Sequence, residues 1–361
     1  MPVDKSLHPL PFVDKMPSLA IPACSAADSP RTVKAKGETM LTDQRKKGLR
    51  RSGPNQAGLV LPMPAPQTLI QKRLIDTAGR LTDPGDEITY QHSILCQTGL
   101  PYRNPGVDVR EWQREQGSAS LMVEAGQAKD METGQWVKLG LPWGPKARLV
   151  LMHLNSEAIR TQSPEIDVGD SLTAFVKRLG LDTNGRTVRG IKDQVGALSG
   201  ALIRMAFSGP QGDFQIDSKV VSGFNLWFPK DERQRVLWPS YVRLSADYFE
   251  SLRTHAVPLD EPAIAALSHS AMALDIYAWL AQRLHRIPKP HRQFIPWPLL
   301  KAQFGPDYER LRKFRAVFME ALRQVHVVYP SAKIDVNGQG LFLYTSPPPV
   351  AKTGVVVQLP K

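Results

Sequence analysis

The stretch from residue 170 to residue 207 constrains the fold of this chain more than any other. Residues 170–179 place apolar side chains at helical spacing behind an acidic start, and Gly180 follows where such a helix would end. After a turn at residues 181–185, a second apolar row runs at helical spacing from Val188, with basic residues off the row. Two helices joined by a tight glycine-containing turn, the second basic near its start, predict a helix-turn-helix.

Sequence that favours a β-hairpin follows the second helix. Residues 202–208 and 214–220 can form its two strands, and Gly209-Pro210-Gln211-Gly212 supplies the turn between them. A hairpin directly after the second helix makes the arrangement a winged helix. We therefore predict a first winged-helix domain at residues 146–228, which begins with a helix at residues 146–160.

The segment before this domain, residues 86–145, consists of short stretches that favour β-strands, separated by glycine and proline. We expect a strand at residues 88–95 and a hairpin with strands at 119–125 and 135–139. We predict that this β-rich segment leads into the first domain.

The pattern of the first domain recurs towards the C-terminus. A linker at residues 229–240 is expected to precede a second winged-helix domain at residues 241–346. The second domain has a long helix at 260–285, a short helix at 296–305, a longer helix capped by Asp307, and a hairpin whose turn is Asn337-Gly338. The predicted fold class is thus α+β, with winged-helix domains in tandem that share a pattern rather than residue identities.

Charge and proline content set the ends of the 361-residue chain apart. The formal net charge of +12 and the isoelectric point near 9.7 favour an anionic partner, nucleic acid ahead of a membrane surface. Residues 1–85 hold 11 of the 31 prolines and no sustained apolar period, so we predict a disordered, basic, proline-rich tail. Residues 347–361 are expected to form a loose C-terminal tail.

The candidate DNA contacts gather near the start of the longer helix in each domain. An α-helix fits the major groove, where arginine or lysine can bridge O6 and N7 of guanine while neighbouring residues hold phosphates. An amphipathic helix that shows its cations only to water has the same pattern, and for either helix alone this alternative stays open. The predicted DNA-binding residues are Arg186, Thr187, Arg189, Lys192 and Lys219 in the first domain, and Arg310, Arg312, Lys313 and Arg315 in the second.

The sequence favours binding over catalysis, so we expect no enzyme. The eight histidines are never spaced as His-x-His, the pair that a rolling-circle nicking enzyme needs for its metal, and no phosphate-binding Gly-x-x-x-x-Gly-Lys-Ser/Thr loop occurs. Cys24 and Cys96, the only cysteines, fit a reducing cytoplasm and make a disulfide framework or a cysteine zinc site implausible. We expect no cofactor and no metal. No run approaches the length of a membrane span, so no membrane partner is expected either.

Several longer runs follow one another in a recognisable order. These are Gln91–Arg103, Asp170–Phe175 with Leu179–Asp182, Leu226–Ser240, and Ala271–Asp275 with Trp279–Leu284. Together they resemble the plasmid-encoded RepA replication initiator proteins of bacteria. The likeness extends over residues 80–350, and the residues before it show none.

The resemblance implies a protein that binds repeated double-stranded DNA sequences at a plasmid origin, helps to melt the adjacent duplex and recruits the host replicative helicase. It also implies tandem winged-helix domains, a homodimer as a second form that represses the protein's own gene, and no catalytic residue. A transcriptional repressor built on the same two domains is the closest alternative. A nicking enzyme and a pure protein-interaction role are more distant alternatives.

Overall fold

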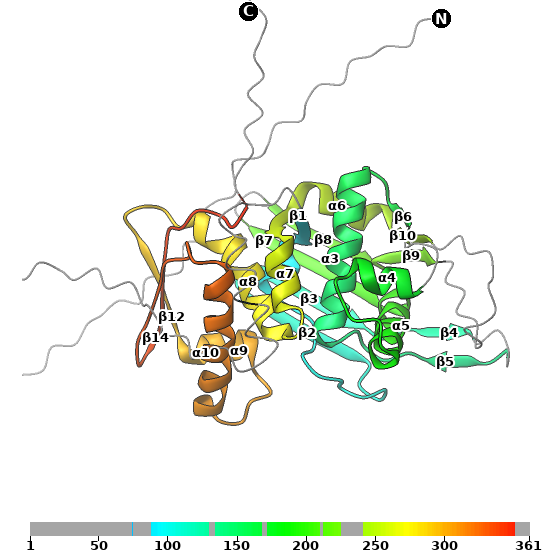
Figure 1. The fold of residues 1–361 in the computed structure, drawn as a ribbon, viewed down its shortest axis with the longest axis horizontal. Helices are drawn as coiled ribbons and strands as arrows, with labels where there is room; N and C mark the ends of the chain where they lie inside the picture. The colour runs from blue at the N-terminus through cyan, green and yellow to red at the C-terminus, as the bar shows by residue number, and fades with distance from the viewer. Residues whose placement is uncertain are drawn as a thin grey trace, which may run out of the picture. The chain divides into compact units, whose positions relative to one another are not determined.

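The computed structural model describes residues 74, 88–129, 134–167, 172–209, 212–224 and 241–350. All of them lie in one compact unit, Met63–Lys361, in which helices and strands are mixed along the chain (Figure 1). The predicted α+β class is therefore confirmed. The predicted disordered tail at residues 1–85 falls outside the described residues except for Leu74, and so do the predicted linker at 229–240 and residues 351–361 of the predicted C-terminal tail.

The first of two hydrophobic cores, called here the first core, lies between helices and antiparallel sheets. Buried side chains such as Leu121, Val150, Val195 and Leu252 build it. Sheet β2-β3-β7-β8 and sheet β6-β10-β9 supply its strands. Its helices are α3 (Gly144–Thr161), α4 (Leu172–Arg178), α5 (Gly185–Gly200) and α6 (Ala246–His255), and its strands are β2 (Glu111–Gln116), β3 (Ala119–Glu124), β6 (Glu165–Asp167), β7 (Leu202–Gly209), β8 (Gly212–Ser218), β9 (Val221–Phe224) and β10 (Tyr241–Leu244).

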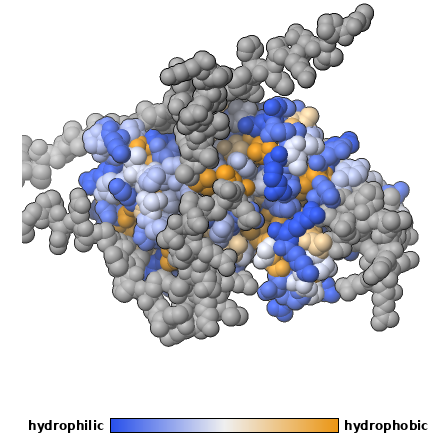
Figure 2. Space-filling model, turned by 45° about the horizontal axis from the view of Figure 1, so that its top comes forward, coloured by the Kyte–Doolittle hydropathy of each residue, from blue (hydrophilic) through white to orange (hydrophobic). Residues whose placement is uncertain are grey.

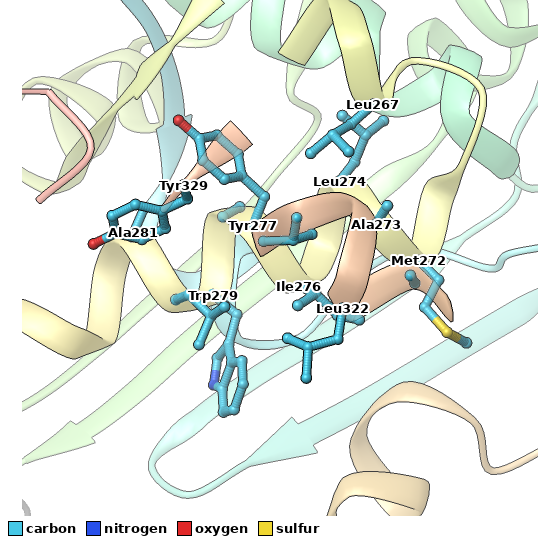
Figure 3. Packing of buried hydrophobic residues seen from close by; sticks show 14 of the residues in the cluster. Leu267, Met272, Ala273, Leu274, Ile276, Tyr277, Trp279, Ala281, Leu322 and Tyr329 are labelled. Carbon is cyan, nitrogen blue, oxygen red and sulfur yellow. The ribbon is translucent and has the colours of Figure 1, made fainter. Parts of the chain in front are cut away.

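The second core surrounds helix α8 (Ala271–Arg283), whose residues 271–282 are all buried. A helix that is apolar on every side must be covered on every side, and α8 packs against α3, α7 and α10. Figure 3 shows Trp279 and Tyr277 of α8 among Leu322 and Tyr329 of the C-terminal part. The other helices around the second core are α7 (Glu261–Leu267), the 3-10 helix η1 (Leu284–Arg286), α9 (Trp297–Phe304) and α10 (Leu311–Val328). Its sheet has the strands β12 (Arg292–Pro296), β13 (Ile334–Val336) and β14 (Gly340–Tyr344) in the order β12-β14-β13.

The two cores are joined by an antiparallel strand pair and a short helix. Strand β1 (Ile88–His92) pairs with β11 (Ala256–Asp260), so that Ile88 faces Asp260 and His92 faces Ala256. Helix α2 (Ser93–Gln97) is buried and packs against α8. The segment before the first core therefore contacts both cores.

A buried ion pair also joins the two cores. Arg148 of α3 donates from Nε to Asp275 Oδ1 of α8 at 2.6 Å and from Nη2 to Oδ2 at 2.7 Å. Its remaining hydrogen bonds go to the carbonyls of Leu100, Pro101 and Gly144. The side chains are only 3% and 8% exposed, so all five donors of the guanidinium have an acceptor away from water.

Two helices and a strand hairpin are present where the sequence predicts the helix-turn-helix and its hairpin. Helix α4 ends before Gly180, which has a φ of +67°, a conformation that favours glycine. Helix α5 begins after Asn184, whose side chain accepts a hydrogen bond from the Thr187 amide. Strands β7 and β8 form the hairpin that follows, in register from Ile203 opposite Ser218 to the tip at Gly209 and Gly212.

The expectations for the β-rich segment were partly wrong. The strand at residues 88–95 ends at His92, because the ring of His92 accepts a hydrogen bond from the Ile94 amide and starts α2. The predicted partners 119–125 and 135–139 do not pair with each other. Strand β3 pairs with β2 and β7 instead, and two short strands, β4 (Gln127–Lys129) and β5 (Trp136–Lys138), pair with each other.

The expectations for the second domain needed three corrections. The long helix at 260–285 is broken, because Ser270 caps α8 by accepting a hydrogen bond from the Ala273 amide. The predicted cap Asp307 does not begin a helix, since α10 starts at Leu311. Residues 241–255, which we expected to open the second domain, form β10 and α6 and pack in the first core.

Candidate nucleic-acid interface

The exposed start of α5 is the clearest candidate surface for DNA. Ile191, Val195 and Leu198 hold the helix on the first core, so its opposite side faces solvent. Arg186, Arg189 and Lys192 are exposed on that side, while Thr187 is half-buried beside the cap. Residues three apart lie on neighbouring parts of a helix surface. The structure therefore brings the three predicted cations of α5 onto one exposed strip.

Lys146 of α3 joins this strip, although the sequence analysis did not select it. Its Nζ donates to the carbonyl oxygens of Arg186 at 3.3 Å and Thr187 at 3.4 Å. Burial lowers the pKa of Lys146, and the charge of Arg186 lowers it further, while Asp193 opposes both. A Cβ at Gly190 would collide with Lys146 Nζ, so the glycine makes room for the lysine. No local sequence signal connects Lys146 to residues forty positions later.

Lys219 lies in the connection between β8 and β9 and is exposed. Strand β9 packs against α5, which places this connection in the same part of the first core as the helix. Lys219 is therefore exposed on the same core as α5, and no hydrogen bond joins it to the strip of Arg186, Arg189 and Lys192 in the described residues.

The four predicted cations of α10 do not form one surface. Arg310 and Lys313 line a cavity of about 810 Å³, together with residues 101–105 and the start of α8. Arg315 instead donates to the Gly338 carbonyl at 3.4 Å and lies 4.7 Å from the centre of the Trp297 ring. Arg312 is exposed. A sequence pattern gives the angle of each side chain around the helix but not the neighbour that holds it.

Across the described ranges, no group of three or more His, Cys, Asp or Glu side chains is arranged to hold a metal ion. Cys96 is buried, and burial raises the pKa of its thiol. In the part of the chain that the structure describes, no helix has the length and apolar character needed to cross a membrane.

The described surface is mostly polar, with a few large apolar side chains on it. On the face drawn in Figure 2, hydrophilic residues lie beside smaller hydrophobic areas. Among the exposed large apolar residues, Trp136 has the highest exposure at 67%, ahead of Val107 and Leu299 at 58% each. Trp136 belongs to β5, which lies outside both cores.

Part of the chain is similar to a known protein family. Two crystal structures of RctB domains 2 and 3 are similar to this chain, each with 11% identity and a TM-score of 0.42. The match to the selenomethionine derivatives covers 68% of this chain and 95% of that chain. The match to the other structure covers 69% of this chain and 94% of that chain. No curated protein sequence matches. Residues 141–298 match the family described as plasmid encoded RepA protein. This segment includes α4, α5 and the hairpin β7–β8, and its match to that family agrees with the resemblance seen in the sequence.

Proposed function

We propose that the protein is a plasmid replication initiator that acts by binding repeated double-stranded DNA sequences at the plasmid origin, without catalysis of its own. The family match over residues 141–298 supports the role in plasmid replication. The observation that carries DNA binding is the strip of Arg186, Arg189, Lys192 and Lys146 at the exposed start of α5. That strip lies inside the matched segment.

The element order supports winged-helix domains in both halves of the molecule. In the second half, α8, β12, α9, α10 and the hairpin β13–β14 follow one another, and the strands form a sheet in the order β12-β14-β13. In the first half, α3, β6, α4, α5 and the hairpin β7–β8 follow in the same succession, but β6 pairs with β10 and the hairpin pairs with β3. The second helix of each helix pair would be the one that enters the major groove.

The two halves would contact DNA unequally. The start of α5 offers an unbroken exposed strip, whereas in α10 Arg315 is held at the hairpin turn and two other cations border a cavity. We propose that α5 supplies the base contacts and that Arg312 of α10 adds a phosphate contact. The protein bound to these repeats, as a monomer or a homodimer, would promote duplex melting and recruit the host helicase. The same bound state would repress the protein's own gene.

A footprint on the DNA around the protein's own gene, taken at two salt concentrations, tests the proposal. Protection of evenly spaced direct repeats is the expected result, and it should weaken at the higher salt with a slope of about −0.9 per neutralised phosphate. Protection of a single promoter palindrome would favour a transcriptional repressor. A covalent protein–DNA adduct on supercoiled plasmid would instead establish a nicking enzyme.

Substitution of Arg189 by alanine tests the role of α5 in this binding. Arg189→Ala should weaken binding to the protected repeat by about 1–3 kcal/mol if the side chain reads a base. Arg253→Ala is the matched control, because Arg253 is an exposed arginine on α6 that pairs with Glu250 outside the helix pair. Equal affinity of Arg189→Ala and Arg253→Ala would contradict the assignment of α5.

A further inference from the structure

The short hairpin of β4 and β5 stands apart from both cores. Its strands pair only with each other, in a two-stranded sheet of their own, and Figure 1 shows them side by side, extending away from α5. Five of its six strand residues are exposed, Ala128 being the exception. Since an isolated two-stranded hairpin is marginally stable in water, something must hold this one in place.

The root of the hairpin is held by Arg110. Its Nη1 donates to the Leu139 carbonyl at 2.6 Å, and its Nη2 donates to the carbonyls of Ala125 at 2.5 Å and Gly126 at 2.8 Å. The backbone of Gly126 lies directly against the Gly200 carbonyl at the end of α5, where a Cβ would not fit. The hairpin is therefore anchored to the same helix whose start forms the candidate DNA surface.

One face of the hairpin carries two lysines, a tryptophan and a glutamine. In the strand register, Lys129 lies directly opposite Trp136, and Gln127 lies opposite Lys138. Side chains alternate between the two faces of a strand, so Trp136 and Lys138 share a face with Lys129. Val137 and Ala128 pair on the other face. Gln127 lies on this face as well, and the exposed indole has one exposed lysine across the strand pair and the other two residues along its own strand.

We propose that this face of the β4–β5 hairpin is a second contact with duplex DNA, beside the site bound by α5. The inference rests on the proposed function. Lys129 and Lys138 contact phosphates on either side of the indole, while Trp136 packs its apolar ring against the sugars and base edges between them. A two-stranded ribbon is narrow enough to enter a DNA groove. The indole couples a large apolar surface with one N–H donor, which suits a site that is partly wet.

Duplex DNA fits this face better than a protein partner does. Lysine is depleted in protein–protein interfaces relative to the rest of the surface, and charged groups are excluded from their cores. Here the lysines flank the only large apolar side chain of the face. Asp130 and Glu132 follow β4 in the sequence but lie outside the described residues, so the face is defined by the two strands alone.

The test measures binding of the full chain to a duplex from the region upstream of its own gene, across a series of salt concentrations. The double variant Lys129→Ala with Lys138→Ala should reduce the magnitude of the salt slope by about 1.8, or about 0.9 for each lost phosphate contact. Trp136→Ala should weaken binding roughly tenfold, because the apolar contact of the indole with the DNA is lost. Val137→Ala is the matched control, since it truncates the neighbouring apolar residue on the opposite face, and it should leave affinity unchanged.

The outcomes separate this inference from the function on which it rests. If the unaltered chain binds the duplex, Arg189→Ala weakens it, and the hairpin variants all bind with unchanged affinity and salt slope, the hairpin contact is overturned and the proposed function stands. Failure of the unaltered chain to bind any duplex overturns both. A Trp136-dependent preference for single-stranded over duplex DNA overturns the assignment to duplex. Unchanged circular dichroism of the variants, expected because all four substituted side chains are exposed, shows that they are folded.

Discussion

At the scale of single residues, His92 shows how burial fixes a protonation state. Its Nδ1 accepts from the Ile94 amide at 3.3 Å, and its Nε2 lies 3.0 Å from Ser251 Oγ. Burial lowers the pKa of His92 to about 3, and the nearby charge of His255 adds to the shift. The folded protein therefore keeps His92 neutral at pH values where an unfolded chain would protonate it.

The neutral state of His92 predicts an acid-dependent loss of stability. Because its folded pKa lies below the unfolded value near 6.5, its contribution is complete above pH 6.5 and is lost as the pH falls towards 3. At pH 5 the loss should be about 2 kcal/mol. His92→Asn keeps a capping side chain for α2. In this variant the drop in the free energy of unfolding from pH 7.5 to pH 5 should be smaller by about 2 kcal/mol than in the unaltered protein.

Denaturant unfolding at the two pH values measures this difference. His153, whose pKa burial lowers to about 4, retains its own pH dependence in the variant, so some acid sensitivity must remain. The exposed His291 supplies the control variant His291→Asn. An identical pH dependence in His92→Asn and the unaltered protein would show that His92 is not responsible.

The residue scale also shows which parts of the candidate site could be predicted. Arg186, Arg189 and Lys192 were predictable, because helical spacing alone puts them on the side opposite the apolar row. Arg315 follows the same rule but is held by Gly338 and Trp297, contacts that depend on how α10 packs against the hairpin. Lys146 carried no signal, since its partners come from a different helix.

At the scale of elements, replacing glycine by alanine should have opposite effects on stability at Gly126 and at Gly196. A Cβ at Gly126 would overlap the backbone carbonyl of Gly200, and neither backbone can yield without moving the hairpin root from α5. A Cβ at Gly196, inside α5, would meet nothing within 4 Å. Gly126→Ala should therefore destabilise the protein by about 1–3 kcal/mol, whereas Gly196→Ala should stabilise it by up to about 1 kcal/mol.

Urea unfolding of the two variants measures both effects, and each serves as the control for the other. Destabilisation by Gly196→Ala would mean that α5 packs more closely on its neighbours than the structure shows. A neutral Gly126→Ala would mean that the hairpin root can move freely, which would also weaken the case for an anchored DNA contact.

The elements that the sequence predicted are those whose signals are local. Helix α4 ends at Gly180 and the β13–β14 hairpin turns at Asn337 because of residues within a few positions. The pairing of β3 with β7 was not predictable in this way, since Ala119 faces Phe207, far along the chain. The break at Ser270 was hidden because apolar residues continue on both sides of it.

At the scale of the whole molecule, α8 makes the two halves one structure. Asp275 is the only charged residue among its buried positions 271–282, and a buried carboxylate needs a partner. The sequence could therefore have indicated that Asp275 is paired, but not that Arg148, 127 positions earlier, is its partner. The consequence is a fixed relation between the helix pair α4–α5 on the first core and the helix pair α9–α10 on the second.

Removal of Arg148 should therefore weaken both cores together. Arg148→Ala leaves Asp275 buried without its cation and removes one hydrogen-bond donor from each of the carbonyls of Leu100, Pro101 and Gly144. The expected cost is about 3–5 kcal/mol in the free energy of unfolding, and hydrogen exchange should accelerate in α3 and α10 alike. Arg323→Ala should cost under about 0.5 kcal/mol, because Arg323 and Glu320 form an exposed pair on α10. Faster hydrogen exchange in only one core would show that the Arg148–Asp275 pair does not couple the two halves. Each half would then respond to the substitution independently of the other.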